Sequence, residues 1–304
     1  MILRMELRQS DGWGKYLEYL GWKTENLEGC AVRIRGLGSF GSIVKIQRPE
    51  KLPLQEIENL VKKHRALFVR IEPSNESQAE DLASSGYKTD SWPLNPTRTI
   101  FIDLKKSNNE LLESFSKDTR QSIKKATQLK LSPIVYNPTS KDFEHSLGIF
   151  YDLFKQTGLE KKFWIPSLNE LKAKARAFKN SCYLILTFRI YEKLQPKTNL
   201  LPLSGAFLLL HDGVGYYHHA ASLHLGQLVK APYLTLWESL KTANAQGCKR
   251  MDLEGIFDSR FPSMFKKWIG FSTFKLKWGG EVFEYPPPFT KIYNPVVKLL
   301  FKFS

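Results

Sequence analysis

The stretch from residue 182 to residue 246 decides the fold, because three apolar runs are followed there by a helix-like segment. The runs are CYLILTFRI (182–190), LSGAFLLL (203–210) and GYYHHAA (215–221), and residues 231–246 read APYLTLWESLKTANAQ. Short apolar runs bounded by turn residues predict buried strands, whereas apolar residues spaced three or four apart predict a helix. We therefore expect three strands, one helix and a further strand at Arg250–Leu253.

The same alternation extends toward the N-terminus. Helices are predicted after Ser10 and at Pro53–Lys63, Glu76–Ser85, Leu111–Leu129, Phe143–Gln156 and Leu168–Phe178, and strands at Ala31–Ile34, Ser42–Ile46, Leu67–Ile71 and Thr99–Leu104. Helices and strands alternate in two successive series within the 304 residues. This pattern favours an α/β (α+β) fold of two units over one barrel. We place the boundary near Pro138, giving domains 1–138 and 139–304.

Composition limits the partners and the compartment. The formal net charge of +15 favours polyanionic partners such as nucleic acid, anionic lipid or phosphorylated substrates. The three cysteines are scattered, which favours the cytosol over a disulfide framework or a zinc site. The most apolar stretch, Leu200–Leu210, is too short to span a bilayer. We expect a cytoplasmic protein with no metal and no cofactor.

A glycine-rich segment resembles two phosphate-binding motifs. Gly36-Leu-Gly-Ser-Phe-Gly41 has the dinucleotide-binding spacing, and Arg33–Gly38 has the spacing of an acyl-CoA loop. Both motifs need a helix directly after them, because the helix N-terminus holds the phosphates. The next residues, Ser42–Ile46, are typical of a strand instead. A hairpin turn is therefore the better interpretation.

Two adjacent histidines, His218 and His219, raise the question of a metal site. Neighbouring residues of a regular strand point to opposite faces, so the two rings are not expected to chelate one ion. We expect one buried histidine and one that faces a pocket.

Two basic stretches are candidates for nucleic-acid contact. Arg120, Lys124 and Lys125 lie on a predicted helix, where Arg120 and Lys124 share a face. Residues 260–277 hold five basic residues and no acid, interleaved with Phe265, Trp268, Phe271 and Phe274, with Trp278 directly after. Cations beside aromatic rings suit single-stranded nucleic acid. A solvated face over an aromatic core explains the same pattern.

Six short segments, in order along the chain, resemble the FemABX family of peptidoglycan aminoacyltransferases over nearly the whole length. They are Gln9–Lys15, Val69–Pro73, Pro96–Leu104, Thr119–Ala126, Trp237–Gly255 and Phe274–Gly280. The resemblance implies two fused acetyltransferase-like (GNAT-like) domains with mixed central sheets that no longer use CoA. It also implies that a tail at about residues 285–304 packs back on the first, precursor-binding domain.

The resemblance implies roles as well. Lys275 matches the family's essential lysine, which assists the aminoacyl-tRNA end, and Glu72 matches an acid near the acceptor amine; these are the candidate catalytic residues. Lys15 matches a lysine that holds the precursor's phosphates. The family's second phosphate-binding base has no clean match, and Lys161 and Lys162 are the nearest residues. His219 stands where some members have tyrosine.

These matches imply the transfer of an amino acid from aminoacyl-tRNA to the stem peptide of UDP-MurNAc-pentapeptide or lipid II. Candidate contacts to the precursor are Lys15, Lys161, Lys162, Tyr217 and His219. Candidate contacts to tRNA are Arg120, Lys124, Lys125, Lys266, Lys267, Phe274 and Trp278.

Three alternatives stay open. One is an N-acyltransferase of lipid or exopolysaccharide synthesis that uses acyl-CoA or acyl carrier protein, with a functional loop at Arg33–Gly38. Another is a non-catalytic RNA-binding protein. A third concerns the tail, where Val296, Val297, Leu300 and Phe303 share a helical face that would either rest on the inner face of the membrane or dock on its own domain.

Overall fold

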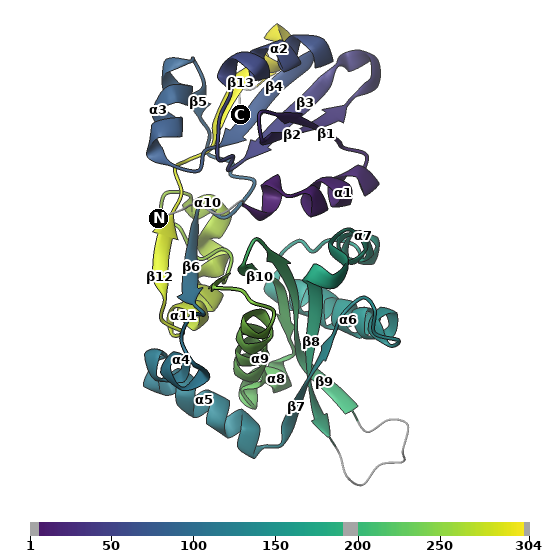
Figure 1. Cartoon of the computed structure of the whole chain (residues 1–304), viewed down its shortest axis with the longest axis vertical. Coiled ribbons are helices and arrows are strands. Elements are labelled where there is room, and N and C mark those ends of the chain that lie inside the picture. Colours follow the sequence, from purple (N-terminus) through teal and green to yellow (C-terminus); the bar gives the residue numbers. More distant parts are fainter. Residues whose placement is uncertain (1–5, 191–199, 301–304) are drawn as a thin grey trace. The chain divides into compact units, whose positions relative to one another are not determined.

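The computed structural model describes residues 6–190 and 200–300 and divides the chain into two compact units. In the described chain, unit 1 holds residues 6–98, 258–264 and 284–300, and unit 2 holds residues 99–257 and 265–283 (Figure 1). The predicted boundary near Pro138 therefore lies inside unit 2. The division falls at Arg98/Thr99 instead, because the strands and helices between Thr99 and Pro138 pack into the second core.

Unit 1 is built on a six-stranded sheet in the order β1-β2-β3-β4-β13-β5. Its strands are β1 (Lys23–Leu27), β2 (Cys30–Gly36), β3 (Ser42–Gln47), β4 (Ala66–Glu72), β5 (Lys88–Thr89) and β13 (Phe289–Ile292). Neighbours pair antiparallel except β3 and β4, which run parallel. The helix α2 (Leu54–His64) connects these two strands and buries Ile57, Leu60 and Val61.

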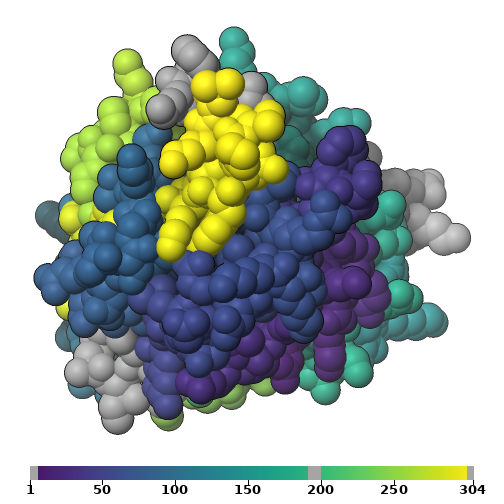
Figure 2. All heavy atoms as spheres, turned by 90° about the horizontal axis from the view of Figure 1, so that it is seen from above, coloured from purple at the N-terminus to yellow at the C-terminus, as the bar shows by residue number. Residues whose placement is uncertain are grey.

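The other helices of unit 1 are α1 (Asp11–Tyr19), α3 (Glu76–Ser84) and α12 (Pro295–Leu300), and short 3₁₀ turns lie at η1 (Leu7–Gln9) and η2 (Gly38–Phe40). As predicted, Ser10 caps α1 by accepting a hydrogen bond from the Trp13 amide. The C-terminal segment supplies β13, a strand between β4 and β5. Figure 2 shows this segment, in yellow, against the blue surface of unit 1.

The glycine-rich segment forms the predicted hairpin turn. η2 is followed directly by β3, and no helix N-terminus is available there for phosphates. Gly41 has a φ of 108°, and a Cβ at this position would lie 2.3 Å from the Arg65 carbonyl oxygen. Only glycine fits at position 41, so Gly41 serves the close approach of this turn to the chain just before β4.

Unit 2 contains a seven-stranded sheet in the order β12-β6-β11-β10-β9-β8-β7. The strands are β6 (Arg98–Asp103), β7 (Leu131–Tyr136), β8 (Cys182–Ile190), β9 (Leu200–His211), β10 (Val214–Ser222), β11 (Arg250–Asp252) and β12 (Glu281–Glu284). β10 and β11 run parallel, and β8, β9 and β10 form an antiparallel meander. This arrangement confirms the three strands and the helix predicted at the start.

The helices of unit 2 are α4 (Asn108–Ser114), α5 (Lys117–Gln128), α6 (Phe143–Lys161), α7 (Leu168–Phe178), α8 (His224–Leu228), α9 (Ala231–Ala245) and α11 (Ile269–Leu276), with α10 (Pro262–Phe265) and the turns η3 (Lys179–Ser181) and η4 (Lys266–Trp268). α9 and α6 cover opposite faces of the meander (Figure 1). The side chains of the strands alternate accordingly, so that Phe207 meets Phe150 of α6 while Leu208 lies in the core around α9.

Two predicted elements differ from the structure. The helix predicted at Leu111–Leu129 is two helices, because Phe115 is buried in the core and Ser116 starts a new helix by accepting from the Thr119 amide. The aromatic segment before the tail contains α11, which the sequence reading missed. Within the described residues, none of the helices is both long and apolar enough to cross a membrane.

Candidate functional site

Lys275, the predicted catalytic lysine, lies in the last turn of α11 in unit 2. Its Nζ donates to the carbonyl oxygens of Glu254 at 3.1 Å and Gly255 at 2.8 Å. The Nζ also lies 4.9 Å from the centre of the Phe271 ring. Burial lowers the pKa of Lys275 to about 8, against the opposing attraction of the Glu254 and Asp252 carboxylates. Lys275 is half-buried, and with this pKa it carries most of its charge at neutral pH.

The carbonyl oxygens that hold Lys275 come from a strained turn after β11. Glu254 has a φ of 56°, in the left-handed region that side chains other than glycine rarely adopt. The Asp252 carboxylate stabilises the turn by accepting from the Glu254 amide at 2.6 Å and from the Thr99 hydroxyl. The turn thereby presents two successive carbonyl oxygens to one ammonium group.

His218 and His219 lie side by side, which corrects the expectation that they point to opposite faces. The pairing of β10 with β9 shifts register between Tyr217 and His219, so the strand bulges at His218. The two imidazole ring centres are 4.2 Å apart. Lys174 of α7 places its Nζ 3.0 Å from His218 Nε2 and 2.9 Å from His219 Nε2.

The histidine pair connects to the Lys275 site through Glu254. His218 Nδ1 lies 3.5 Å from Glu254 Oε1, and both side chains are almost completely buried. Lys174 is 4% exposed. Lys174, His218, Glu254 and Lys275 therefore form a continuous row of ionisable groups. Among the residues that the structure describes, no cluster of three or more His, Cys, Asp or Glu side chains is arranged to hold a metal ion.

Glu72, the predicted acid near the acceptor amine, has both carboxylate oxygens hydrogen-bonded to groups of the protein itself. It ends β4 and is buried, and its Oε1 accepts from the amides of Leu94 and Asn95, both at 2.7 Å. Its Oε2 accepts from the side-chain amides of Asn95 and, at 3.5 Å, Gln47. Two carboxylate oxygens that take four donors hold the 94–95 loop against the sheet.

Among the predicted precursor contacts, Lys15 is exposed on α1, and Lys161 and Lys162 are exposed at the end of α6. Lys162 adopts the left-handed conformation there, and its carbonyl oxygen accepts from Lys267 Nζ at 3.0 Å. Tyr217 is 5% exposed within the core of unit 2, so its ring packs there and does not face solvent.

The predicted tRNA contacts divide into exposed and buried residues. Lys124, Lys125, Lys266 and Lys267 are exposed. Arg120 is exposed as well, but its guanidinium donates to the carbonyl oxygens of Glu113 and Phe115 and thereby ties α5 to the end of α4. Phe274 is half-buried against Tyr233.

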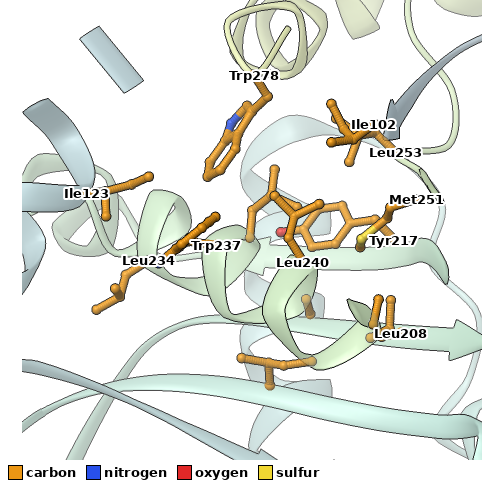
Figure 3. Packing of buried hydrophobic residues seen from close by; sticks show 14 of the residues in the cluster. Ile102, Ile123, Leu208, Tyr217, Leu234, Trp237, Leu240, Met251, Leu253 and Trp278 are labelled. Carbon is orange, nitrogen blue, oxygen red and sulfur yellow. The ribbon is translucent and has the colours of Figure 1, made fainter. Parts of the chain in front are cut away.

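Trp278 does not reach the surface, which corrects its assignment as a stacking residue. It is fully buried, and Figure 3 shows it among Trp237, Leu234 and Leu240. Phe115 packs edge-on against its ring, with the ring centres 4.9 Å apart. The aromatic residues of this segment therefore belong partly to the core, as the alternative interpretation held.

Lys174, His218 and Glu254 are the site residues that the sequence reading missed or left without a role. Lys174 carried a signal, because it shares a buried helical face with Leu171, Ala175 and Phe178. A lysine on an apolar stripe needs a polar partner inside the fold.

Comparison with family models finds a match in the C-terminal part of the chain. The family model described as "FemAB family" matches residues 188–304, a segment that includes His218, Glu254 and Lys275. No curated protein matches the chain by sequence.

Solved structures match over almost the whole chain. The crystal structure of FemX is similar with a TM-score of 0.80 and 16% identity, covering 98% of this chain and 95% of that one. The C-terminal domain of a putative lysylphosphatidylglycerol synthetase from Agrobacterium fabrum has a TM-score of 0.60 and 12% identity, covering 97% and 92%. A tandem GNAT protein from the clavulanic acid biosynthesis pathway has a TM-score of 0.53 and 9% identity, covering 88% and 81%. The segment 188–304 therefore matches the FemAB family model, and the whole chain has a fold similar to that of FemX and of a tandem GNAT protein.

Proposed function

We propose that this protein is a peptidoglycan-bridge aminoacyltransferase that moves an amino acid from aminoacyl-tRNA to an amine of a precursor stem peptide. The family match and the FemX-like fold support aminoacyl transfer in general. The observation that carries the finer proposal is the placement of Lys275, a half-buried ammonium held by the carbonyl oxygens of Glu254 and Gly255.

The reaction is a direct aminolysis. The neutral amine attacks the ester carbonyl, a tetrahedral oxyanion forms, and the bond from carbon to ribose oxygen breaks. The proton of the attacking amine passes to the departing ribose oxygen. Lys275 stabilises the negative charge that develops on these oxygens, because an ammonium held in place by hydrogen bonds acts as a fixed positive charge beside them. Alignment of the two substrates supplies a further part of the rate, ~7 kcal/mol or more in favourable cases.

The remaining residues bind and position. Exposed Lys161, Lys162, Lys266 and Lys267 form a basic surface on unit 2 that suits the phosphates of the tRNA or precursor. Lys15 serves the precursor's phosphates on unit 1. Glu72 assists the acceptor indirectly, by holding the 94–95 loop in place.

We place the reaction in the cytoplasm, where charged tRNA is available. The tail would touch the membrane near a lipid-linked acceptor through the exposed Val296 and Leu299 of α12. Leu300 and Phe303, which complete the predicted apolar face, have side chains outside the described residues.

The decisive experiment measures transfer of radiolabelled amino acids from a total charged-tRNA pool to UDP-MurNAc-pentapeptide and, separately, to lipid II. Lys275→Met should strongly reduce transfer, whereas Lys241→Met, which removes a partly exposed lysine paired with Glu238, should keep it. Transfer to neither acceptor, together with thermal stabilisation by acyl-CoA, would replace the proposal with the CoA-dependent alternative.

A further inference from the structure

The row of ionisable groups in unit 2 has a defined direction of hydrogen bonding. An ammonium can only donate, so Lys174 Nζ donates to the Nε2 atoms of His218 and His219, at 3.0 and 2.9 Å. Each ring then carries its proton on Nδ1, an assignment that follows from the hydrogen-bond network. His218 Nδ1–H consequently faces Glu254 Oε1 at 3.5 Å. Glu254 thus meets His218 through its carboxylate and Lys275 through its backbone carbonyl oxygen.

We propose that Lys174, His218 and Glu254 are positioning residues that keep Lys275 charged and directed at the reacting oxygens. Glu254 acts twice in this arrangement. Its carbonyl oxygen accepts from Lys275, and its carboxylate lies near enough to attract the ammonium. His218 lies against that carboxylate, and Lys174 holds the His218 ring from its other side. The role in transfer rests on the proposed function, whereas the effect on Lys275 does not.

The backbone conformation of Glu254 supports a functional role for this group of residues in addition to packing. A left-handed conformation at a residue other than glycine is maintained only where the surroundings enforce it, and such positions gather at functional sites. Here the hydrogen bond from the Glu254 amide to Asp252 stabilises the left-handed conformation at Glu254. The resulting turn places two carbonyl oxygens against the Lys275 ammonium. A buried Lys174 is also a costly way to fill space, because apolar side chains of similar size do so without desolvating a charge.

The groups that face each member come from several elements. Lys275 is faced by the carboxylates of Glu254 and Asp252 and by the Phe271 ring of its own helix. Glu254 is faced by His218 and Lys275, and His218 by Lys174 and His219. Glu254 is the acid that joins the two ends, so its removal should have the largest effect.

The test measures the ionisation of Lys275 without any substrate. The rate at which acetic anhydride acetylates Lys275 is followed against pH by mass spectrometry, because only the neutral amine reacts. Glu254→Gln keeps the side-chain shape and removes the charge that favours the ammonium. If the pKa falls from about 8 by one unit, acetylation at pH 7.5 becomes about three-fold faster. His218→Gln should shift it in the same direction by less. Lys174→Met also removes a nearby positive charge, so its two effects on the pKa oppose each other and its shift should be the smallest.

Lys172→Met is the matched control, since Lys172 lies on the same helix but is exposed and paired with Glu144. Equal labelling profiles in Glu254→Gln, Lys174→Met and Lys172→Met, with equal melting temperatures, would overturn the proposal. If the profiles shift but the wild-type protein transfers no amino acid, the positioning role stands and the proposed function falls.

Discussion

The two units use equivalent positions of their sheets in opposite ways. Each has one parallel strand pair joined by a helical crossover, β3–α2–β4 in unit 1 and β10–α8–α9–β11 in unit 2. An acid lies at or just after the carboxyl end of the second strand in both, Glu72 and Glu254. Uncharged amides saturate Glu72, whereas Glu254 lies between a histidine and a lysine. The acid at this end of the sheet therefore holds a loop in unit 1, whereas in unit 2 it favours the charged form of Lys275.

Removal of Lys275 is the sharpest way to break this comparison. Lys275→Met should lower the rate of transfer by about 10²–10³-fold, the usual cost of losing one group that stabilises an oxyanion. Initial rates with charged tRNA and precursor measure it, and a circular dichroism melt checks the fold. A rate within two- to three-fold of the Lys241→Met control would show that Lys275 takes no part in transfer. Glu254, which acts through Lys275, would then have no role in the reaction either.

The pH dependence sharpens the comparison further. The pKa of Lys275 is about 8, lower than its usual 10.5, so the charge is complete at neutral pH and disappears as pH rises through 8. Transfer should fall over that range, after correction for alkaline loss of the aminoacyl ester. Lys275→Arg should remove this decline from whatever activity remains, because arginine stays charged. A decline near pH 8 that persists in the arginine variant would assign it to another group.

Stability gives a second pH test with its own sign. Between about pH 8 and 10.5 the unfolded chain holds a proton on Lys275 that the folded chain has lost. The unfolding free energy should therefore rise with pH in this window, relative to Lys275→Met. Urea unfolding at pH 7.5 and 10 measures the difference, and a parallel change in both proteins would contradict it.

Substitution of the two acids tests their contrast directly. Glu72→Gln turns an NH₂ group toward the amide donors of the 94–95 loop, so about 1–3 kcal/mol of unfolding free energy should be lost. Glu254→Gln should cost less, since its environment contains no such set of backbone donors among the described contacts. Urea titrations of both variants supply the measurement. Equal losses would mean that both acids are mainly structural.

The smallest expected effect concerns the basic surface. Lys267→Met should weaken tRNA binding a few-fold and reduce the slope of log affinity against log salt by about 1. Filter binding at several salt concentrations detects this. The Lys241→Met variant should keep the wild-type slope, and an identical slope for Lys267→Met would remove this lysine from the interface.

Local pattern was enough to predict most elements, whereas Lys275 was singled out only by the resemblance to the family, and neither source predicted the contacts around it. Alternation assumes a regular strand, so the bulge that brings His218 beside His219 was invisible to it. Trp278 lies in a basic, aromatic segment, yet its burial depends on Phe115 and Trp237 from distant parts of the chain. The unit boundary depends likewise on long-range packing, since the residues from Thr99 to Pro138 form ordinary helices and strands in either unit.

The interleaving of the two units also sets an order of folding during synthesis. β13 lies between β4 and β5, and the ribosome makes it only after all of unit 2. Until then β4 has an open edge, and such edges favour pairing with other chains. Unit 2 can complete its core first, while unit 1 must wait for its own last strand. A nascent chain stalled before Phe289 should therefore contain a protease-resistant second unit and an unfinished first one.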